Sequence, residues 1–345
     1  MFFASDNAAG IAAPILEAIG RANTGYALSY GNDDCTKRVE KKFAEIFERE
    51  VGVFLVPTGT VANSLAIAHL TPPWGAVLCH AESHIATDEC GAPEFFGGGI
   101  KLVGLKGEGS KISSETFRVA LDGQWGGPHH VSPSVLSLSQ ATECGTVYRV
   151  AEVKELADIA HARGVAVHMD GARLGNALAR MNVSLAEVTW KAGVDVLSFG
   201  ATKGGAMGAE AMIFFDPKHG ANMQDRRKRG GALLSKLRFI AVQMEAYLES
   251  DLWLKLARHA NDMADALAAG LTAAGAKPVW PVEANEVFAP LTLEADKRLK
   301  AAGAMYHPWP SAGLNIGAGK ILVRLVTSFQ TTKDDVDKFL ATMRA

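Results

Sequence analysis

The sequence predicts an α/β protein: a large domain with a mostly parallel sheet covered by helices, then a smaller C-terminal α+β domain. Between about residue 35 and Pro217, short apolar runs alternate with amphipathic helical segments, which is the pattern of a parallel sheet. After Pro217 the alternation stops and a long helical region follows, with an expected break near Ser250. The 345 residues are enough for one large domain or two of ordinary size.

Apolar periodicity places the elements of the large domain. A helix is predicted over 35–50, where apolar residues recur on one face, and Asp33 and Asp34 are candidate N-caps. Further helices are predicted at 61–70 and, most clearly, at 151–163. Buried strands are expected at 51–56, 76–80, 100–105, 134–139, 165–169, 194–199 and 210–215.

The C-terminal part has a different pattern, with fewer and shorter strands. Strands are predicted at 285–292 and 321–327, and a last helix at 333–344. We therefore divide the chain into a large domain, 1–248, which includes an N-terminal arm, and a small domain, 249–345.

Composition excludes several classes of function. Apolar residues make up 48% and charged residues 21%, which is typical of a globular protein, and the net charge of −2 favours neither nucleic acid nor an anionic membrane. The N-terminus has no basic start or long apolar stretch, so no signal peptide is expected, and no run reaches the ~18 apolar residues of a membrane span. The scattered cysteines indicate reduced thiols and a cytoplasmic location. They are Cys35, Cys79, Cys90 and Cys144.

Two apolar runs each end in a charged residue, Asp170 and Lys203. Ligands of open α/β sheets bind outside the carboxyl ends of the strands. An amine and an acid there would suit the two ends of pyridoxal phosphate, since the amine binds the aldehyde and the acid keeps the ring nitrogen protonated. Taken alone, the pair is more simply interpreted as a salt bridge at the sheet edge.

A strand-to-helix turn, Thr58-Gly59-Thr60, is a candidate phosphate site. Exposed N–H groups and the helix dipole favour an anion at such a turn, Gly59 permits close approach, and the Thr60 hydroxyl adds a donor. The alternative is a simple turn capped by a threonine.

Histidines supply a second set of candidates. His84 follows the run 76–80, where it could stack on a flat cofactor or act as a base. His80 and His84 have the spacing of a zinc pair, but no third ligand is evident, so no metal is predicted. His129 and His130 precede the strand 134–139 and are expected either in the site or on a loop.

Three arginine positions carry further predictions. Arg173 lies at a strand end, where it could bind a carboxylate or a phenolate. Arg324 interrupts the apolar strand 321–327; it would pair with a substrate carboxylate or face solvent from an edge strand. The basic run 226–229 is predicted as a flexible solvated loop, or as a loop that reaches a phosphate across a subunit interface.

Taken in order along the chain, these motifs resemble the L-threonine aldolase family of fold-type-I pyridoxal-phosphate enzymes, in its bacterial low-specificity branch. The resemblance implies an aspartate-aminotransferase-like large domain, a small C-terminal domain, and dimers that share the active site and commonly pair into homotetramers. The motifs that carry it are Ser5-Asp6-Asn7, Tyr30-Gly31, Pro57-Thr58-Gly59-Thr60, His84, Asp170-Gly171-Ala172-Arg173 and Thr202-Lys203-Gly204-Gly205.

The resemblance also implies roles for the cofactor contacts. Lys203 would bind the aldehyde of pyridoxal 5'-phosphate, Asp170 would pair with the pyridine nitrogen, and His84 would stack on the ring. Gly59 and Thr60 would hold the phosphate.

Other roles concern the substrate and the catalytic histidines. By the resemblance, Ser5, Arg173 and Arg324 would surround the cofactor oxygen and the substrate carboxylate. Either His129 or His130 would match the second active-site histidine of the family.

One departure from the family concerns the phosphate. The family often has an arginine that reaches the phosphate of the neighbouring subunit, and this chain has Leu234 at that position. Arg229 or Lys228 would take over the contact, or the contact would be lost.

The implied activity is retro-aldol cleavage of β-hydroxy-α-amino acids, such as L-threonine, to glycine and an aldehyde. The base for the β-hydroxyl proton stays open among His84, one of His129 and His130, and a water held by them. Two rival functions remain: another pyridoxal-phosphate reaction, such as β-elimination or transamination, and a catalytically silent relative of the same fold.

Overall fold

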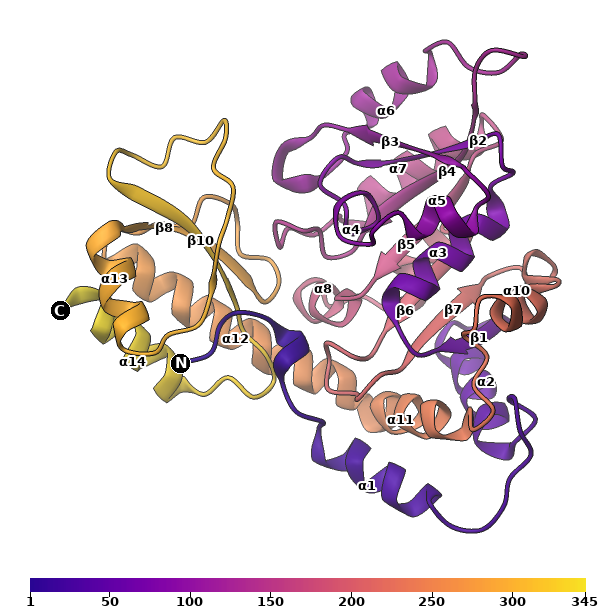
Figure 1. The fold of residues 1–345 in the computed structure, drawn as a ribbon, viewed down its shortest axis with the longest axis horizontal. Helices are drawn as coiled ribbons and strands as arrows, with labels where there is room; N and C mark the ends of the chain where they lie inside the picture. The colour runs from indigo at the N-terminus through magenta and orange to yellow at the C-terminus, as the bar shows by residue number, and fades with distance from the viewer.

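The computed structural model describes residues 1–345, and its larger part is a seven-stranded sheet in the order β1-β7-β6-β5-β4-β2-β3 (Figure 1). β2 to β6 are mutually parallel, whereas β7 runs antiparallel between β6 and β1. This confirms the predicted mostly parallel sheet. The strands are β1 Gly52–Val56, β2 Gly75–His80, β3 Lys101–Leu105, β4 Ser132–Ser139, β5 Ala166–Gly171, β6 Val196–Gly200 and β7 Glu210–Phe214.

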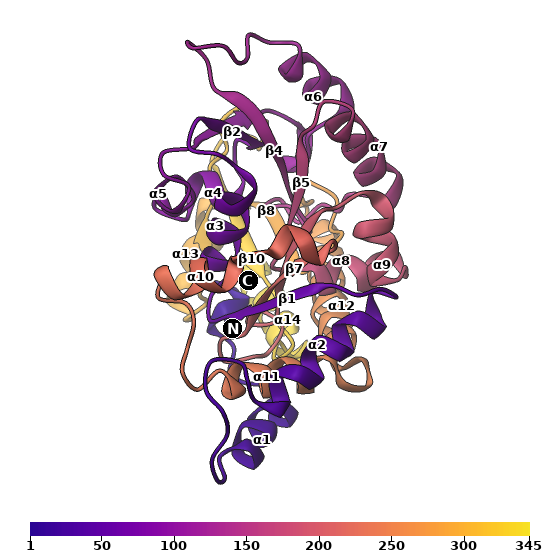
Figure 2. The same cartoon turned by 90° about the vertical axis from the view of Figure 1, so that its right-hand side faces the viewer.

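Helices cover both faces of this sheet, as the alternating pattern predicts. Figure 2 shows α3 and α5 on one side, with α6, α7 and α9 on the other. The helices of this part are α1 Ala13–Ala22, α2 Asp34–Ile46, α3 Gly59–Leu70, α4 His84–Thr87, α5 Ala92–Phe96, α6 Ser114–Leu121, α7 Val150–His161, α8 Leu174–Met181, α9 Leu185–Val188, α10 Met223–Arg229 and α11 Arg238–Leu248.

The prediction of a flexible loop at 226–229 is wrong, because these residues form the last turn of α10. The side chain of Arg227 is buried, and its Nη1 donates a hydrogen bond to the carbonyl oxygen of Leu55 at 2.6 Å. The guanidinium group thus satisfies a backbone acceptor of β1 and fixes the turn against the sheet. Arg226 is partly exposed, and Lys228 and Arg229 are exposed.

The C-terminal part is α+β, as predicted, with a three-stranded antiparallel sheet in the order β8-β10-β9. The expected break separates α11 from the next helix, because Ser250 and Asp251 take positive φ angles of 50° and 56°. The elements are α12 Leu252–Ala273, β8 Glu286–Thr292, α13 Leu293–Ala301, β9 His307–Pro308, β10 Lys320–Val326 and α14 Lys333–Arg344. No helix is both long and apolar enough to cross a membrane.

The N-terminal arm lies against the C-terminal sheet. The Phe3 N–H donates to the carbonyl oxygen of Met305 at 2.8 Å, and the Val326 N–H donates to that of Phe3 at 2.8 Å. The Phe3 ring is fully buried, 5.2 Å from the Phe339 ring. The start of the arm is therefore fixed to the small sheet. The division of the chain after residue 248 stays a prediction.

The strand register brings the carboxyl ends of β4, β5 and β6 together. Ser139 pairs with Asp170, and Asp170 pairs with Ser198, so three polar residues lie side by side at one edge of an apolar sheet. Because parallel strands end at the same edge, polar side chains that are distant in sequence converge there.

The N-cap of α2 provides a test of local stability. Asp33 is buried and accepts hydrogen bonds from the N–H and the hydroxyl of Thr36, at 2.9 and 3.0 Å. Asp33→Ala should therefore lower the free energy of unfolding by about 1 kcal/mol in urea titrations followed by circular dichroism. The adjacent Asp34→Ala is the control: its exposed carboxylate caps nothing, so the change should stay within about 0.5 kcal/mol. Equal effects would contradict this assignment of the cap.

Candidate active site

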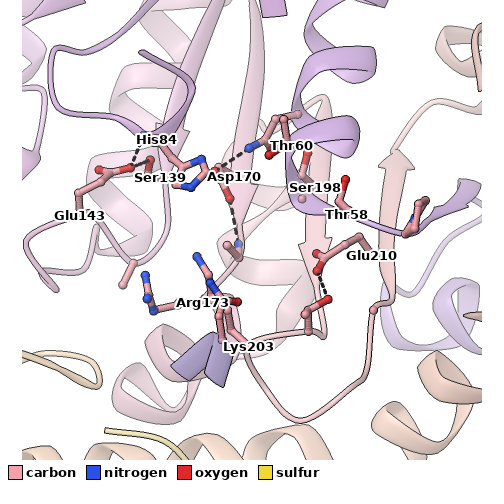
Figure 3. A pocket seen from close by; sticks show the side chains of 18 of the residues that line it. Thr58, Thr60, His84, Ser139, Glu143, Asp170, Arg173, Ser198, Lys203 and Glu210 are labelled. Atoms are coloured by element: carbon pink, nitrogen blue, oxygen red, sulfur yellow. Dashed lines mark hydrogen bonds between the residues drawn. The ribbon is translucent and has the colours of Figure 1, made fainter. Parts of the chain in front are cut away.

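A cavity of about 360 Å³ opens at the carboxyl edge of the large sheet, and six of the predicted residues line it (Figure 3). Its walls come from the N-terminus of α3, the ends of β4, β5 and β6, and the loop between β6 and β7. The predicted residues that line it are Gly59, Thr60, His84, Asp170, Arg173 and Lys203. Their catalytic and binding roles stay predictions.

Asp170 is a buried carboxylate at the end of β5. Its Oδ2 accepts a hydrogen bond from Asn63 Nδ2 at 2.8 Å, and its Oδ1 accepts one from the Ala172 N–H at 3.0 Å. Burial by itself would raise the pKa of Asp170, but the positive charges of Lys203 and His84 and the Ala172 N–H bring it below its usual value. Asp170 is thus an anion at neutral pH.

The amine of Lys203 has no ion-pair partner in the structure. No carboxylate oxygen lies within 4.0 Å of its Nζ, so the salt bridge between Asp170 and Lys203, the simpler interpretation of the sequence, does not form. The turn that carries Lys203 is fixed by backbone hydrogen bonds from Gly204 and Ala206 to the carbonyl oxygen of Ala201. Because no carboxylate pairs with it, the Lys203 amine is available to a ligand in the cavity.

The two threonines of the turn before α3 have different hydrogen-bonding roles. Thr58 is the N-cap, and its Oγ1 accepts a hydrogen bond from the Val61 N–H at 3.3 Å. The Thr60 hydroxyl has no hydrogen-bond partner within the protein, and a Cβ at Gly59 would meet no atom within 4 Å. The turn therefore leaves space and a free donor at the start of a helix, as an anion requires.

A chain of hydrogen bonds joins Asp170 to His84 through two residues that the sequence analysis missed. Asn63 Nδ2 donates to Asp170 and also to Glu89 Oε1, at 2.9 Å, and the same oxygen is 2.9 Å from His84 Nδ1. The hydrogen bond to Glu89 raises the pKa of His84. The one available signal was Asn63 itself, which with Ser64 is polar in an otherwise apolar, buried part of α3.

Two further acids line the cavity, and no sequence pattern pointed to either of them. Glu143 Oε1 accepts hydrogen bonds from the His84 N–H at 2.9 Å and from Ser139 Oγ at 2.7 Å. Glu210 accepts a hydrogen bond from the Thr202 hydroxyl. Burial raises the pKa of Glu143 and that of Glu210 to about 7.

Arg173 connects the cavity to both sheets. Its Nε and Nη2 donate to the two carboxylate oxygens of Asp6, at 2.8 and 3.0 Å, and its Nη1 lies 3.3 Å from Glu286 Oε2 at the start of β8. Burial by itself would raise the pKa of Asp6, but Arg173 brings it below its usual value. The guanidinium group is therefore fixed in place by the N-terminal arm and by the small sheet.

Ser5 and Arg324 lie close to this network but do not line the cavity. Ser5 Oγ accepts a hydrogen bond from the Asn7 N–H at 3.1 Å, and it is Asn7 that lines the cavity. Arg324 stacks over Trp309 at 5.0 Å, and its Nη2 lies 3.4 Å from the carbonyl oxygen of Ala4. Its Nε is buried without a hydrogen-bond partner.

Three predicted residues lie elsewhere in this chain. His129 and His130 are exposed and line a different cavity beside β3, together with Trp125. Arg229 is exposed at the end of α10, and Leu234, the position of the missing arginine, is also exposed. A single chain therefore does not bring these residues to the Lys203 cavity.

The ion pair between Asp6 and Arg173 leads to a test of stability. Asp6→Asn should lower the free energy of unfolding by about 3 kcal/mol at pH 7, because Arg173 stays buried with only Glu286 to balance it. The pKa of Asp6 is lower in the folded state than its ordinary value of 3.8, so its contribution is complete above that value and is lost as the pH falls through the folded pKa. The difference between wild type and variant should thus stay constant from about pH 7 to 5 and shrink below about 4.

The control for this test is an exposed ion pair. Lys154 and Asp158 lie 2.9 Å apart on α7, with both side chains more than half exposed. Asp158→Asn should cost less than about 1 kcal/mol. The interpretation would be wrong if both variants lost equal stability in urea titrations at one protein concentration, or if the Asp6→Asn loss grew as the pH fell.

Comparisons with known proteins place this chain in a family. The beta-eliminating lyase family matches residues 3–293. The low specificity L-threonine aldolase of a Pseudomonas species is 39% identical over 99% of this chain and 97% of that protein, and the one of Pseudomonas aeruginosa is 42% identical over 90% of each. The structure of threonine aldolase from Leishmania major superimposes with a TM-score of 0.93 at 28% identity, covering 99% of this chain and 98% of that one.

A more distant structure shares the fold alone. Serine palmitoyltransferase of Sphingomonas wittichii covers all of this chain with a TM-score of 0.75 at 15% identity. The fold is thus the fold type I of pyridoxal-phosphate enzymes, as predicted. From the identity to two bacterial relatives over nearly the whole length, this chain belongs to the low-specificity L-threonine aldolase family.

Proposed function

We propose that this protein cleaves L-threonine, L-allo-threonine and related β-hydroxy-α-amino acids to glycine and an aldehyde, with pyridoxal 5'-phosphate as its cofactor. Membership of the family supports the reaction. The observation that carries the proposal is the cavity that holds an unpaired Lys203 and an ionised Asp170 without an ion pair between them.

The cavity fits the cofactor in three respects. Lys203 is free to bind the aldehyde, and Asp170 is ionised and so would pair with a protonated pyridine nitrogen. The open space at Gly59 and the unpartnered hydroxyl of Thr60 suit the phosphate. Figure 3 shows His84 next to Asp170, so it would contact a ring whose nitrogen pairs with Asp170. When bound, the cofactor supplies an electron sink for the bond that breaks at the substrate's α-carbon.

Arg173 and Arg324 are the proposed contacts for the substrate carboxylate. Arg173 lines the cavity, and its pairing with Asp6 and Glu286 limits its motion. A guanidinium group fixed in this way orients a carboxylate without losing further side-chain entropy. Arg324, on the small sheet, and Ser5, on the N-terminal arm, would act from beside it.

We assign removal of the substrate's β-hydroxyl proton to His84 or to a water molecule that His84 holds. With Glu89 ionised, Nδ1 of His84 donates to Glu89, which leaves Nε2 as the acceptor. The raised pKa of His84 keeps this nitrogen protonated at acid pH, so removal of the proton should become effective only as the pH rises above it. His129 and His130 could take part only from another copy of the chain.

Assembly into dimers, and into homotetramers from them, is part of the proposal. The segment between α1 and α2 exposes Tyr26 and Leu28, with 108% and 71% of their surface accessible, and Tyr30 with 42%. Such an apolar surface is typical of an interface. The four cysteines are free, which supports a cytoplasmic location.

β-Elimination on the same scaffold is the second candidate, because the family that matches residues 3–293 is described as beta-eliminating lyase. Product analysis separates the reactions. With L-threonine, L-allo-threonine and L-phenylserine assayed side by side, we expect glycine and the matching aldehyde. Ammonia and a keto acid would refute the aldolase proposal.

Lys203→Ala should abolish glycine formation, because no other amine in the cavity can bind the aldehyde. Borohydride should bleach the yellow wild-type protein and attach the cofactor to Lys203, which peptide mass analysis would locate. The matched control is Lys154→Ala, an exposed lysine on α7, which should keep wild-type turnover. Residual glycine formation by Lys203→Ala would show that the lysine is wrongly assigned.

Asp170→Ala should reduce kcat far more than Thr60→Ala at saturating cofactor. The first change removes the charge that holds the ring proton, for which a loss of about 10²–10³-fold is expected. The second removes one hydrogen bond from a hydroxyl group to the phosphate, for which about tenfold is expected, mainly in cofactor affinity. Equal losses in kcat would count against the role of Asp170.

A further inference from the structure

Glu210 lines the end of the cavity where phosphate is proposed to bind. It is the first residue of β7, paired in register with Val56 at the end of β1 and with Gly200 at the end of β6. From Val56 the chain runs directly into the turn 57–60, and from Gly200 it runs to Lys203. The carboxyl group of Glu210 therefore stands between the phosphate turn and the lysine loop, and Figure 3 shows it turned toward the cavity.

The two carboxyl oxygens of Glu210 have different surroundings. The Thr202 hydroxyl accepts from the Ala209 N–H at 3.2 Å and donates to Glu210 Oε1. Oε2 receives no hydrogen bond from the protein, and it lies so near Gly200 that a Cβ there would be 3.0 Å away. Oε1 is thus satisfied by the protein, whereas Oε2 is the oxygen left for a ligand or a proton.

The charges around Glu210 are few. Lys203 influences it from the loop after β6 and Asp170 from the end of β5, and the Tyr247 hydroxyl lies close on α11. The turn 57–60 and the first turn of α3 bring no charged side chain. Burial, partly offset by the Thr202 hydroxyl and by Lys203, raises the pKa of Glu210 to about 7.

A phosphate dianion bound at Gly59 and Thr60 would change the protonation of Glu210. Two anions in contact in a buried site repel strongly, so the neutral form of the acid is favoured. The cationic side chains that line the cavity are His84, Arg173 and Lys203, and no arginine lies at the α3 end. A protonated carboxyl group there would supply a donor where the family often has the arginine that Leu234 replaces.

We propose that Glu210 binds the cofactor phosphate as a neutral carboxylic acid, with its Oε2–H donating to a phosphate oxygen, and that phosphate binding therefore takes up a proton from solvent. The inference rests on the proposed function in placing the phosphate at Gly59 and Thr60. It follows that affinity for the phosphate falls as the pH rises above about 7, since the proton must first be placed on the ionised acid.

Calorimetric titration of the full-length protein, freed of cofactor, tests this inference. The probe is pyridoxine 5'-phosphate, which carries the phosphate but no aldehyde and so cannot bind Lys203 covalently. Titrations at pH 8 in two buffers of different ionisation enthalpy, both free of amines and phosphate, count the protons taken up. Wild type should take up about one proton more than Glu210→Gln, and its affinity should fall by up to about tenfold per pH unit above neutrality.

Glu210→Gln should bind the probe with an affinity that changes much less between pH 7 and 8.5, and about tenfold more tightly than wild type at pH 8, because its amide donates without a proton. The matched control is Glu143→Gln. Glu143 is a partly buried acid of the same cavity whose pKa is also raised to about 7, but it lies at the His84 end. This variant should keep the wild-type uptake and slope.

Pyridoxine, which lacks the phosphate, should show no uptake that depends on Glu210. The inference is overturned if wild type and Glu210→Gln take up equal numbers of protons, if Glu143→Gln loses the uptake instead, or if Glu210→Gln binds more weakly at pH 8. It is also overturned if the ³¹P resonance of the bound probe shows that the phosphate itself has gained the proton. Failure of wild type to bind the probe at all would refute this inference and the proposed cofactor site together.

Discussion

The buried charge of Asp170 is the constraint on which the arrangement of the cavity depends. A carboxylate at the end of an apolar strand is costly unless donors and positive charges surround it. Asn63, the Ala172 N–H, Lys203 and His84 meet that requirement from four different segments. Asn63 and His84 are held in turn by Glu89, so one charge at the sheet edge accounts for much of the convergence of polar groups there.

A second buried ion pair sets the position of the small sheet. Arg173 follows β5 directly, and it pairs with Asp6 on the N-terminal arm and with Glu286 on β8. Asn285 Nδ2 also donates to Asp6 at 3.0 Å, so the acid has partners on both sides. The arm in turn hydrogen-bonds to β10 through Phe3. The Arg173 side of the cavity is therefore held in place, because the N-terminal arm and the small sheet share one guanidinium group.

The acids in and beside the cavity differ in charge. Asp6 is ionised because Arg173 contacts it, and Asp170 is ionised because two N–H groups donate to it and the charges of Lys203 and His84 lie near. Burial instead raises the pKa values of Glu143 and Glu210 to about 7. A bound anion and a bound ring would each shift this balance. The protonation of Glu143 and Glu210 near neutral pH is thus coupled to ligand binding in the cavity.

The strand-and-helix alternation predicts the α/β class and the shared edge, because the carboxyl ends of parallel strands always meet there. For the same reason Gly59, Thr60, Asp170 and Lys203 could be named from sequence alone. The motif order was also sufficient to indicate the family. A local signal was enough in each case, since every one of these residues lies within a few positions of the end of an apolar run.

Tertiary structure alone decided the remainder of the site. β7 inserts antiparallel between β1 and β6, so its first residue, Glu210, reaches the edge where its neighbours end, and no local pattern reveals that insertion. Asn63 and Glu89 have a role only because α3 lies across the sheet close to His84. His129 lies outside the cavity because its loop leaves from the opposite end of β4. The sequence by itself thus determined which strands end near candidate functional side chains. The order and direction of the strands decided which of these side chains meet, because strand order depends on contacts between segments far apart in the chain.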